Sequence, residues 1–279
     1  MSEIISHNLN QQDIVAASTD IIQRIKQQGD KSHVSVERQL ELLEQLSEFE
    51  LGRFLLQNQG LNGYWTDYVL TNPWCKQQRT SLSRLEKFFL EQAPTTLATQ
   101  QRFQIFLECN QQQIKNDVRL ATIPCGLGGE LLYLDYKKIA DIQLVGIDYD
   151  EQALVAATRL AEQKDLASFW QTWQQDIWQL DSHNEFDLIS SNGLNIYQPD
   201  EQKVIALYQI FYQALKPGGC LITSFLTPPP GNEQGCEWEM DLINQEDLLL
   251  QRIIFADILQ VKWQYFCSSQ RIQQQLESI

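Results

Sequence analysis

Residues 118–148 constrain the fold of this chain more than any other stretch. Their pattern predicts an apolar strand, a tight turn, a helix and a second strand that ends in Asp148. The turn has the sequence PCGLGG at 124–129, where glycine allows positive φ angles and close approach of a ligand to the main chain. Asp148 follows the turn by about 20 residues, a spacing that places an acid beside the ribose of a nucleotide. Because GxGxxG is absent, a tight turn without a ligand explains the glycines equally well.

The remaining sequence falls into two regions of different pattern. Apolar residues at helix spacing over 1–116 predict a helical N-terminal domain that forms a cap or lid. From residue 117 short apolar strands alternate with helices, the pattern of a parallel sheet with helices on both faces. We therefore expect an α/β, Rossmann-like domain over 117–279. Its further predicted elements are strands near 168–172, 186–190 and 220–225 and helices at 150–164, 199–215, 245–260 and 268–278.

An aromatic cluster interrupts the helical region. A long helix is expected over 36–57, and residues 60–68 then break the helix period. They bring Tyr64, Trp65 and Tyr68 close together. Packing between helices and a lid over a ligand both explain this cluster, and the sequence leaves the choice open.

Composition restricts the partners and the location of the chain. The net charge of −15 argues against surfaces for nucleic acid or anionic membranes. No apolar run is long enough to span a bilayer and residues 1–10 lack a signal pattern, so we expect a cytoplasmic protein. Six scattered cysteines without a CxxC pair indicate reduced thiols and no metal site. None of the three histidines falls in a predicted motif, which argues against a catalytic histidine.

Four motifs in order resemble those of the class I S-adenosylmethionine (SAM)-dependent methyltransferases. ATIPCGLGG at 121–129 is similar to the first-strand motif, and GID at 146–148 is similar to the acid that holds the ribose. QQDIW at 174–178 resembles the loop that contacts adenine, and ALKPGG at 214–219 resembles the turn before the fifth strand. The segment 187–204 also resembles quinone-type and arsenite-type small-molecule methyltransferases. The resemblance implies SAM as cofactor, bound by Pro124, Cys125, Gly126, Gly128, Asp148, Tyr149, Asp176, Ile177, Asn192 and Gly193.

Each of these assignments has a structural alternative. Asp148 could cap the helix at 150–164, and Asp176 could cap its own loop. Asn192 suits the amino-acid end of the cofactor but also an Asx-turn at a strand end. Cys125 fits a small buried filler better than a nucleophile.

Three departures from the family pattern affect the predicted site. Thr122 stands where the family usually has an acid for the SAM amino group, so another acid or a lid tyrosine would have to replace it. Pro124 replaces the first glycine, and Gly193 stands where arsenite-type enzymes have a cysteine, which speaks against arsenic chemistry. Because the family sheet continues beyond a helix like 268–278, we expect either a trimmed C-terminus or an unusually short sheet that lacks its last strands.

The sequence therefore predicts a SAM-dependent methyltransferase for a small-molecule acceptor. Alignment of donor and acceptor supplies most of such catalysis, and no residue is nominated as catalytic base. The predicted walls of the acceptor pocket are aromatic: Tyr64, Trp65, Tyr68, Tyr197 and Trp238. A Rossmann-type enzyme that uses NAD fits less well, and a methyltransferase fold that has lost catalysis and serves as a binding partner is the main alternative. No oligomeric state is predicted.

Overall fold

The computed structural model describes residues 14–75, 81–230, 236–261 and 265–279. These residues form two compact units. Unit 1 contains the described residues of 102–238 and 263–279, and unit 2 contains those of 6–101 and 239–262. The predicted boundary at 116/117 differs from this division chiefly because the segment 239–262 belongs to the largely helical unit.

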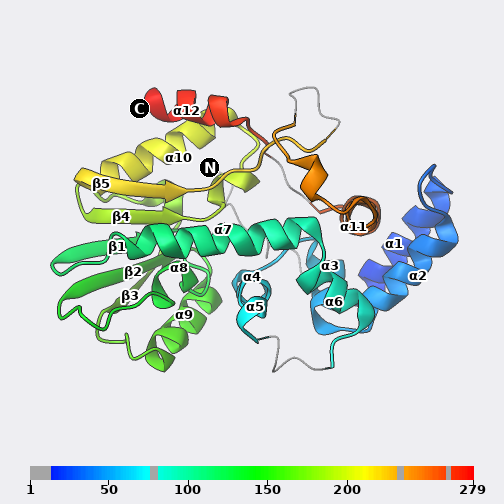
Figure 1. Cartoon of the computed structure of the whole chain (residues 1–279), viewed down its shortest axis with the longest axis horizontal. Helices are drawn as coiled ribbons and strands as arrows, with labels where there is room; N and C mark the ends of the chain where they lie inside the picture. The colour runs from blue at the N-terminus through cyan, green and yellow to red at the C-terminus, as the bar shows by residue number, and fades with distance from the viewer. Residues whose placement is uncertain (1–13, 76–80, 231–235, 262–264) are drawn as a thin grey trace. The chain divides into compact units, whose positions relative to one another are not determined.

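Unit 1 is built on a parallel sheet. Among the described residues its strands are β1 (Val118–Thr122), β2 (Ile142–Asp148), β3 (Trp170–Gln174), β4 (Phe186–Ser191) and β5 (Leu215–Thr223), in the order β3-β2-β1-β4-β5 (Figure 1). All neighbouring strands pair in parallel. The predicted Rossmann-like α/β fold is confirmed, and within the described ranges the sheet ends at β5 on one side.

Both faces of this sheet are apolar and covered by helices. Neighbouring residues of a strand point to opposite faces, which explains why Leu120 and Ala121 belong to different core clusters. One cluster includes the helices α8 (Gly129–Leu132) and α9 (Glu151–Gln163), and the other includes α10 (Glu201–Ala214). Helix α12 (Ser269–Glu277) lies beside α10 (Figure 1).

The fifth strand begins earlier than predicted. The segment Leu215–Gly219, expected as a turn, is the first part of β5. Its pairing with β4 shifts register between Phe186 and Leu188, and Gly218 has a φ of 81°. Lys216 Nζ lies 2.6 Å from an Asp187 carboxylate oxygen of β4. This ion pair and the irregular register let a sequence with proline and glycine run along the sheet edge.

Unit 2 is helical in its described residues. Its elements are α1 (Ile14–Gln28), α2 (Val36–Ser47), α3 (Glu50–Asn58), α4 (Gly63–Leu70), α5 (Asn72–Cys75), α6 (Arg84–Glu91), the short turn η3 (Met240–Leu242), α11 (Gln245–Arg252) and the π-helix η4 (Ile253–Leu259). Helix α7 (Pro94–Gln111) begins in unit 2 and ends in unit 1.

Two predictions for the helical region were wrong. The helix expected over 36–57 is divided into α2 and α3, and residues 63–70 form helix α4 instead of breaking the helical pattern. The side chain of Asn62 explains the second difference, because it caps α4 by accepting a hydrogen bond from the Trp65 N–H at 3.0 Å. The aromatic residues that follow lie on the turns of this capped helix.

An ionic cluster holds the late segment 239–262 within unit 2. Asp257, on η4, accepts from Lys31 Nζ at 2.6 Å and lies 2.8 Å from His33 Nε2. The guanidinium of Arg24 donates at 2.9 Å to the backbone carbonyl of Asp257. Buried apolar residues of η4 join the same core as those of α2 and α6. The helix predicted over 245–260 therefore exists as α11 and η4, but it packs with the N-terminal helices.

None of the helices within the described ranges is both long and apolar enough to cross a lipid bilayer.

Two neighbouring aromatic residues of α10 test the core of unit 1. Phe211 is fully buried, whereas Tyr212 is 65% exposed. Phe211→Ala should lower the free energy of unfolding by about 3–5 kcal/mol, because it leaves a cavity between helix and sheet. The matched change Tyr212→Ala should alter it by less than about 0.5 kcal/mol. Urea unfolding of both variants measures this, and similar losses would contradict the assigned burial.

Candidate functional site

The turn after β1 is tied to the end of β2 by the carboxylate of Asp148. One oxygen of this carboxylate accepts from the Gly126 N–H at 2.8 Å, and the other accepts from the Asp150 N–H at 3.0 Å. The Cys125 N–H also donates to the Ile147 carbonyl at 2.8 Å. These contacts hold the predicted glycine turn and the predicted acid together at the carboxyl edge of the sheet.

The glycine turn is closed by hydrogen bonds within the protein. The N–H groups of Gly126 and Gly128 donate to Asp148 and to the Cys125 carbonyl, so both are bonded within the protein. The helix that follows, α8, contains four residues and supplies only one turn of helix dipole. Gly128 has a φ of 73°, and an added Cβ would lie 2.7 Å from the Trp170 ring. Glycine is therefore required there by backbone conformation and by packing against β3.

Asp148 has the hydrogen-bonding capacity that a ribose diol needs. A carboxylate offers about four acceptor positions, of which Gly126 and Asp150 occupy two. The helix-cap alternative is wrong for Asp148, because Asp150 caps α9 by accepting from the Gln152 N–H at 2.9 Å. Burial raises the pKa of the Asp148 carboxyl, and hydrogen bonds from the backbone amides of Asp150, Gly126 and Tyr149 oppose that shift.

Tyr149 and Asp176, both predicted to bind the cofactor, line one hollow. It has a volume of about 410 Å³, and its other lining residues are Gln174, Gln175 and Gln179. Asp176 also caps the short helix η1 (Ile177–Gln179) by accepting from the Trp178 N–H at 3.1 Å, so its structural alternative is present as well. The side chain of Ile177 is buried in the core, which leaves only its backbone available to a ligand.

The loop after β4 carries a polar contact across the sheet edge. Asn192 Nδ2 donates to Glu130 Oε1 at 3.1 Å, and Asn192 Oδ1 accepts from the Ser224 hydroxyl at 3.2 Å. Gly193 follows with a φ of 95° and precedes the short helix η2 (Leu194–Tyr197). The Asn192 side chain thus joins the loop after β4 to α8 and to the end of β5.

An arginine from α7 belongs to the same group. Burial lowers the pKa of the Arg102 guanidinium, and Tyr197 and Glu130 oppose that shift through their charges. The Nε atom of Arg102 is buried and has no hydrogen-bond partner among the described residues. Burial likewise raises the pKa of the Tyr197 hydroxyl, and Arg102 opposes that shift. Arg102, Glu130 and Tyr197 therefore form a polar group that includes an unsatisfied buried donor.

These groups follow the strand order along one edge of the sheet. The hollow of Tyr149 and Asp176 lies after β2 and β3, Asp148 ends β2, and the glycine turn follows β1. Asn192 and Tyr197 follow β4. Strand β1 pairs with β2 on one side and β4 on the other, so the chain connections diverge there. Parallel α/β sheets bind ligands at this kind of switch point, outside the carboxyl ends of the strands.

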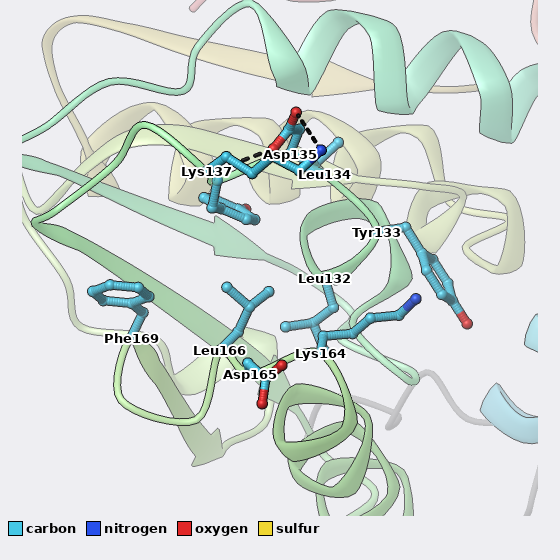
Figure 2. Close-up of a pocket in the computed structure, with 10 residues that line it drawn as sticks. Leu132, Tyr133, Leu134, Asp135, Lys137, Lys164, Asp165, Leu166 and Phe169 are labelled. Carbon is cyan, nitrogen blue, oxygen red and sulfur yellow. Dashed lines mark hydrogen bonds and ion pairs between the residues drawn. The ribbon is translucent and has the colours of Figure 1, made fainter.

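A second hollow lies at the opposite edge, before β2 and β3 (Figure 2). Its volume is about 350 Å³, and residues 132–137, 164–166 and Phe169 supply its lining. Lys164 Nζ lies 4.8 Å from the centre of the Tyr133 ring, and Lys137 pairs with Asp135 at 3.7 Å. None of the predicted site residues lines this hollow.

The five predicted acceptor-pocket residues lie in both units. Trp65 forms edge-to-face contacts with Tyr64 and Tyr68, at centroid distances of 5.0 and 5.2 Å. Trp65 and Tyr68 also pack against the core of unit 2, as the packing alternative requires, whereas Tyr64 is 55% exposed. In unit 1, Tyr197 lies near Arg102, and Trp238 Nε1 donates to the Thr227 hydroxyl at 3.0 Å. Their role at an acceptor stays a prediction.

Arg102 and Glu130 are the residues that sequence reasoning missed. Glu130 directly follows the glycine turn, and that position could have suggested it. Arg102 gave no such signal, because it is one cation within a helix whose partners come from distant segments.

Comparison with known proteins identifies the family. Residues 114–269, more than half of the chain, match the family model described as a methyltransferase domain. A structure described as a possible exported protein from Bordetella parapertussis is 42% identical, with a TM-score of 0.89, and the alignment covers 96% of this chain and 89% of that one. No curated protein matches the sequence.

More distant structures include SAM-dependent methyltransferases solved with S-adenosyl-L-homocysteine. The one from Geobacter sulfurreducens is 16% identical, with a TM-score of 0.38 and coverage of 47% of this chain and 51% of that one. The one from Thiobacillus denitrificans is 19% identical, with a TM-score of 0.39 and coverage of 47% and 52%.

The chain belongs to the methyltransferase-domain family. The resemblance to class I SAM-dependent methyltransferases is thereby confirmed, and SAM is the cofactor of that class, as predicted.

The raised pKa of Asp148 predicts a pH-dependent stability. The folded state binds the Asp148 proton more tightly than the unfolded chain does. The contribution of Asp148 to the free energy of unfolding is therefore greatest below the usual pKa of 3.8, and it decreases as the pH rises through the pKa of the folded state. Wild type should therefore lose free energy of unfolding relative to Asp148→Asn as the pH rises from about 3 to 7. Urea titrations across this range measure the difference. A relative gain by wild type would show that the folded pKa is lowered.

Proposed function

We propose that the protein is an active SAM-dependent methyltransferase that acts on a small-molecule acceptor. The observation that carries this proposal is the Asp148 carboxylate, which hydrogen bonds from the Gly126 and Asp150 N–H groups fix at the switch point of the sheet. The hollow of Tyr149 and Asp176 beside it suits an adenine ring, with an aromatic face and a polar rim.

Family members that transfer methyl groups need few reactive side chains. SAM supplies a methyl group on a sulfonium, which an acceptor displaces directly when the two are aligned. The residues of this chain would then bind and orient: Asp148 would accept the ribose hydroxyls, and Asp176 would accept from the adenine amino group. An amine, thiol or enolate acceptor requires no general base, and no residue is assigned as one.

Net charge and aromatic side chains support the proposed class of acceptor. The net charge of −15 favours a small or cationic acceptor over nucleic acid or an anionic membrane. The aromatic residues Tyr197 and Trp238 of unit 1 suit an acceptor wall, since aromatic faces favour the sulfonium cation. A cytoplasmic location stays a prediction. The similar structure from Bordetella parapertussis is described as a possible exported protein.

Calorimetric titration with SAM and S-adenosylhomocysteine, with NAD as control, tests the proposal. We expect binding of both adenosyl ligands and none of NAD, followed by transfer of labelled methyl groups in a screen of small acceptors. Absence of binding in the folded full chain would refute the proposal. Binding without transfer to any acceptor class would favour the alternative of a binding protein that has lost catalysis.

Two aspartates of the same strand region provide a matched test of the ribose contact. Asp148→Ala removes a charge-assisted hydrogen bond and should weaken SAM binding by about 1.5–3 kcal/mol. Asp141, exposed just before the amino end of β2, is the control, and Asp141→Ala should leave affinity unchanged. Calorimetry on both variants measures the effect, and unchanged affinity in Asp148→Ala would remove Asp148 from the site.

A further inference from the structure

A partly exposed aromatic cluster with an acidic neighbour lies within unit 2. Trp65 is its central ring, and the centres of the Tyr64, Tyr68 and Phe54 rings lie 5.0, 5.2 and 6.0 Å from it. The Tyr68 hydroxyl donates to Glu86 Oε1 at 3.1 Å, which places a carboxylate beside the rings. We infer that this cluster binds a small organic cation that carries an alkylated ammonium group. The site goes beyond the proposed function, because it requires no SAM.

The helices of unit 2 hold the rings and the acid in fixed positions. Tyr64 and Trp65 precede Tyr68 on α4 by four and three residues, and these spacings bring side chains together on a helix surface. Glu86 lies in the first turn of α6, whose cap Ser83 accepts from the Glu86 N–H at 3.2 Å. A ligand would therefore meet a preorganised group of side chains.

Packing of the core explains only part of this cluster. Trp65 and Tyr68 pack against the buried core of unit 2, but both are only half-buried. The Tyr64 ring is 55% exposed although it lies against Trp65, and the Glu86 side chain is half-buried beside Tyr68. The core requires neither the exposed ring nor the carboxylate. Both can meet a ligand from solvent without opening the core.

The chemistry of the cluster favours a positive charge. The face of an aromatic ring attracts a cation that lies within about 6 Å of the ring centre. Because the Tyr64 and Tyr68 centres lie 5.0 and 5.2 Å from that of Trp65, one cation can interact with more than one ring. The Glu86 carboxylate adds a negative charge at the same place. The net charge of −15 also favours the approach of cations to the protein.

An alkylated ammonium group suits these side chains better than a metal ion does. A calcium ion takes about six to eight oxygen ligands, whereas the cluster offers one carboxylate. Within the part of the chain that the structure describes, no group of three or more His, Cys, Asp or Glu side chains could hold a metal ion. Aromatic rings recognise quaternary ammonium groups, whose charge is spread over apolar methyl groups.

Calorimetric titration of the full chain with choline chloride, without SAM, tests the inference. The comparison ligand is the neutral alcohol in which a carbon atom replaces the choline nitrogen. We expect saturable binding of choline and at least about tenfold weaker binding of the neutral alcohol. Tyr64→Leu and Glu86→Gln should each weaken choline binding by at least about threefold. The matched controls Tyr212→Leu, exposed on α10, and Glu37→Gln, exposed on α2, should leave the affinity unchanged.

A conservative variant separates a ring contact from a structural role. Tyr64→Phe keeps the aromatic face and should bind choline within about twofold of wild type, also if Tyr64→Leu fails to fold. Equal affinities for choline and the neutral alcohol would overturn the inference, as would equal losses in the controls or no saturable binding by the folded wild type. Each of these results leaves the proposed function intact. Failure to bind SAM and S-adenosylhomocysteine in separate titrations would instead refute the proposed function alone.

Discussion

The carboxylate of Asp148 is the contact on which the site depends. By accepting from the Gly126 N–H at 2.8 Å, it fixes the turn after β1 against the end of β2. Both strands are fully buried over their centres, so the turn and the acid are presented by a rigid part of the sheet. Burial raises the pKa of this carboxyl, which means that the fold accepts an electrostatic cost to keep an acid at the edge. Such a cost is typical of groups that serve a ligand.

The remaining polar groups are ordered by the sheet. A parallel sheet brings the carboxyl ends of all its strands to one edge, so residues far apart in sequence meet there in strand order. Here the order β3-β2-β1-β4 places four strand ends in a row that runs from Asp176 through Asp148 and the turn to Asn192. A ligand with a flat aromatic end and a diol would find chemically matching groups in the order Asp176, Asp148. This agreement between topology and ligand chemistry supports the proposed cofactor site.

Much of the fold could be predicted, because apolar patterns report burial directly. Alternation of strands and helices predicts the sheet, and the end of the second apolar run predicts that Asp148 stands at the end of a strand. The length of α8 could not be predicted, since a four-residue helix leaves no periodic pattern. Helix α4 was missed because its cap, Asn62, was read as part of a loop. The packing of 239–262 with the N-terminal helices depends on Asp257 and its distant partners, which no local pattern reveals.

The site likewise contains residues that the sequence could locate and residues that it could not. Asp148, Tyr149, Asp176 and Asn192 stand at strand ends, where motif order locates them. Arg102 lies within a long helix, and its role depends on Glu130 and Tyr197, which come from other segments. The hydrogen bonds that the Gly126 and Gly128 amides make inside the protein depend on the folded turn, and no sequence pattern reveals them.

A crystal structure of the full chain with S-adenosylhomocysteine would test the central claim most directly. The account predicts the ribose hydroxyls within hydrogen-bond distance of Asp148 and the adenine in the hollow of Tyr149 and Asp176. A ligand bound instead in the hollow of residues 132–137, 164–166 and Phe169, or one that leaves Asp148 uncontacted, would contradict it.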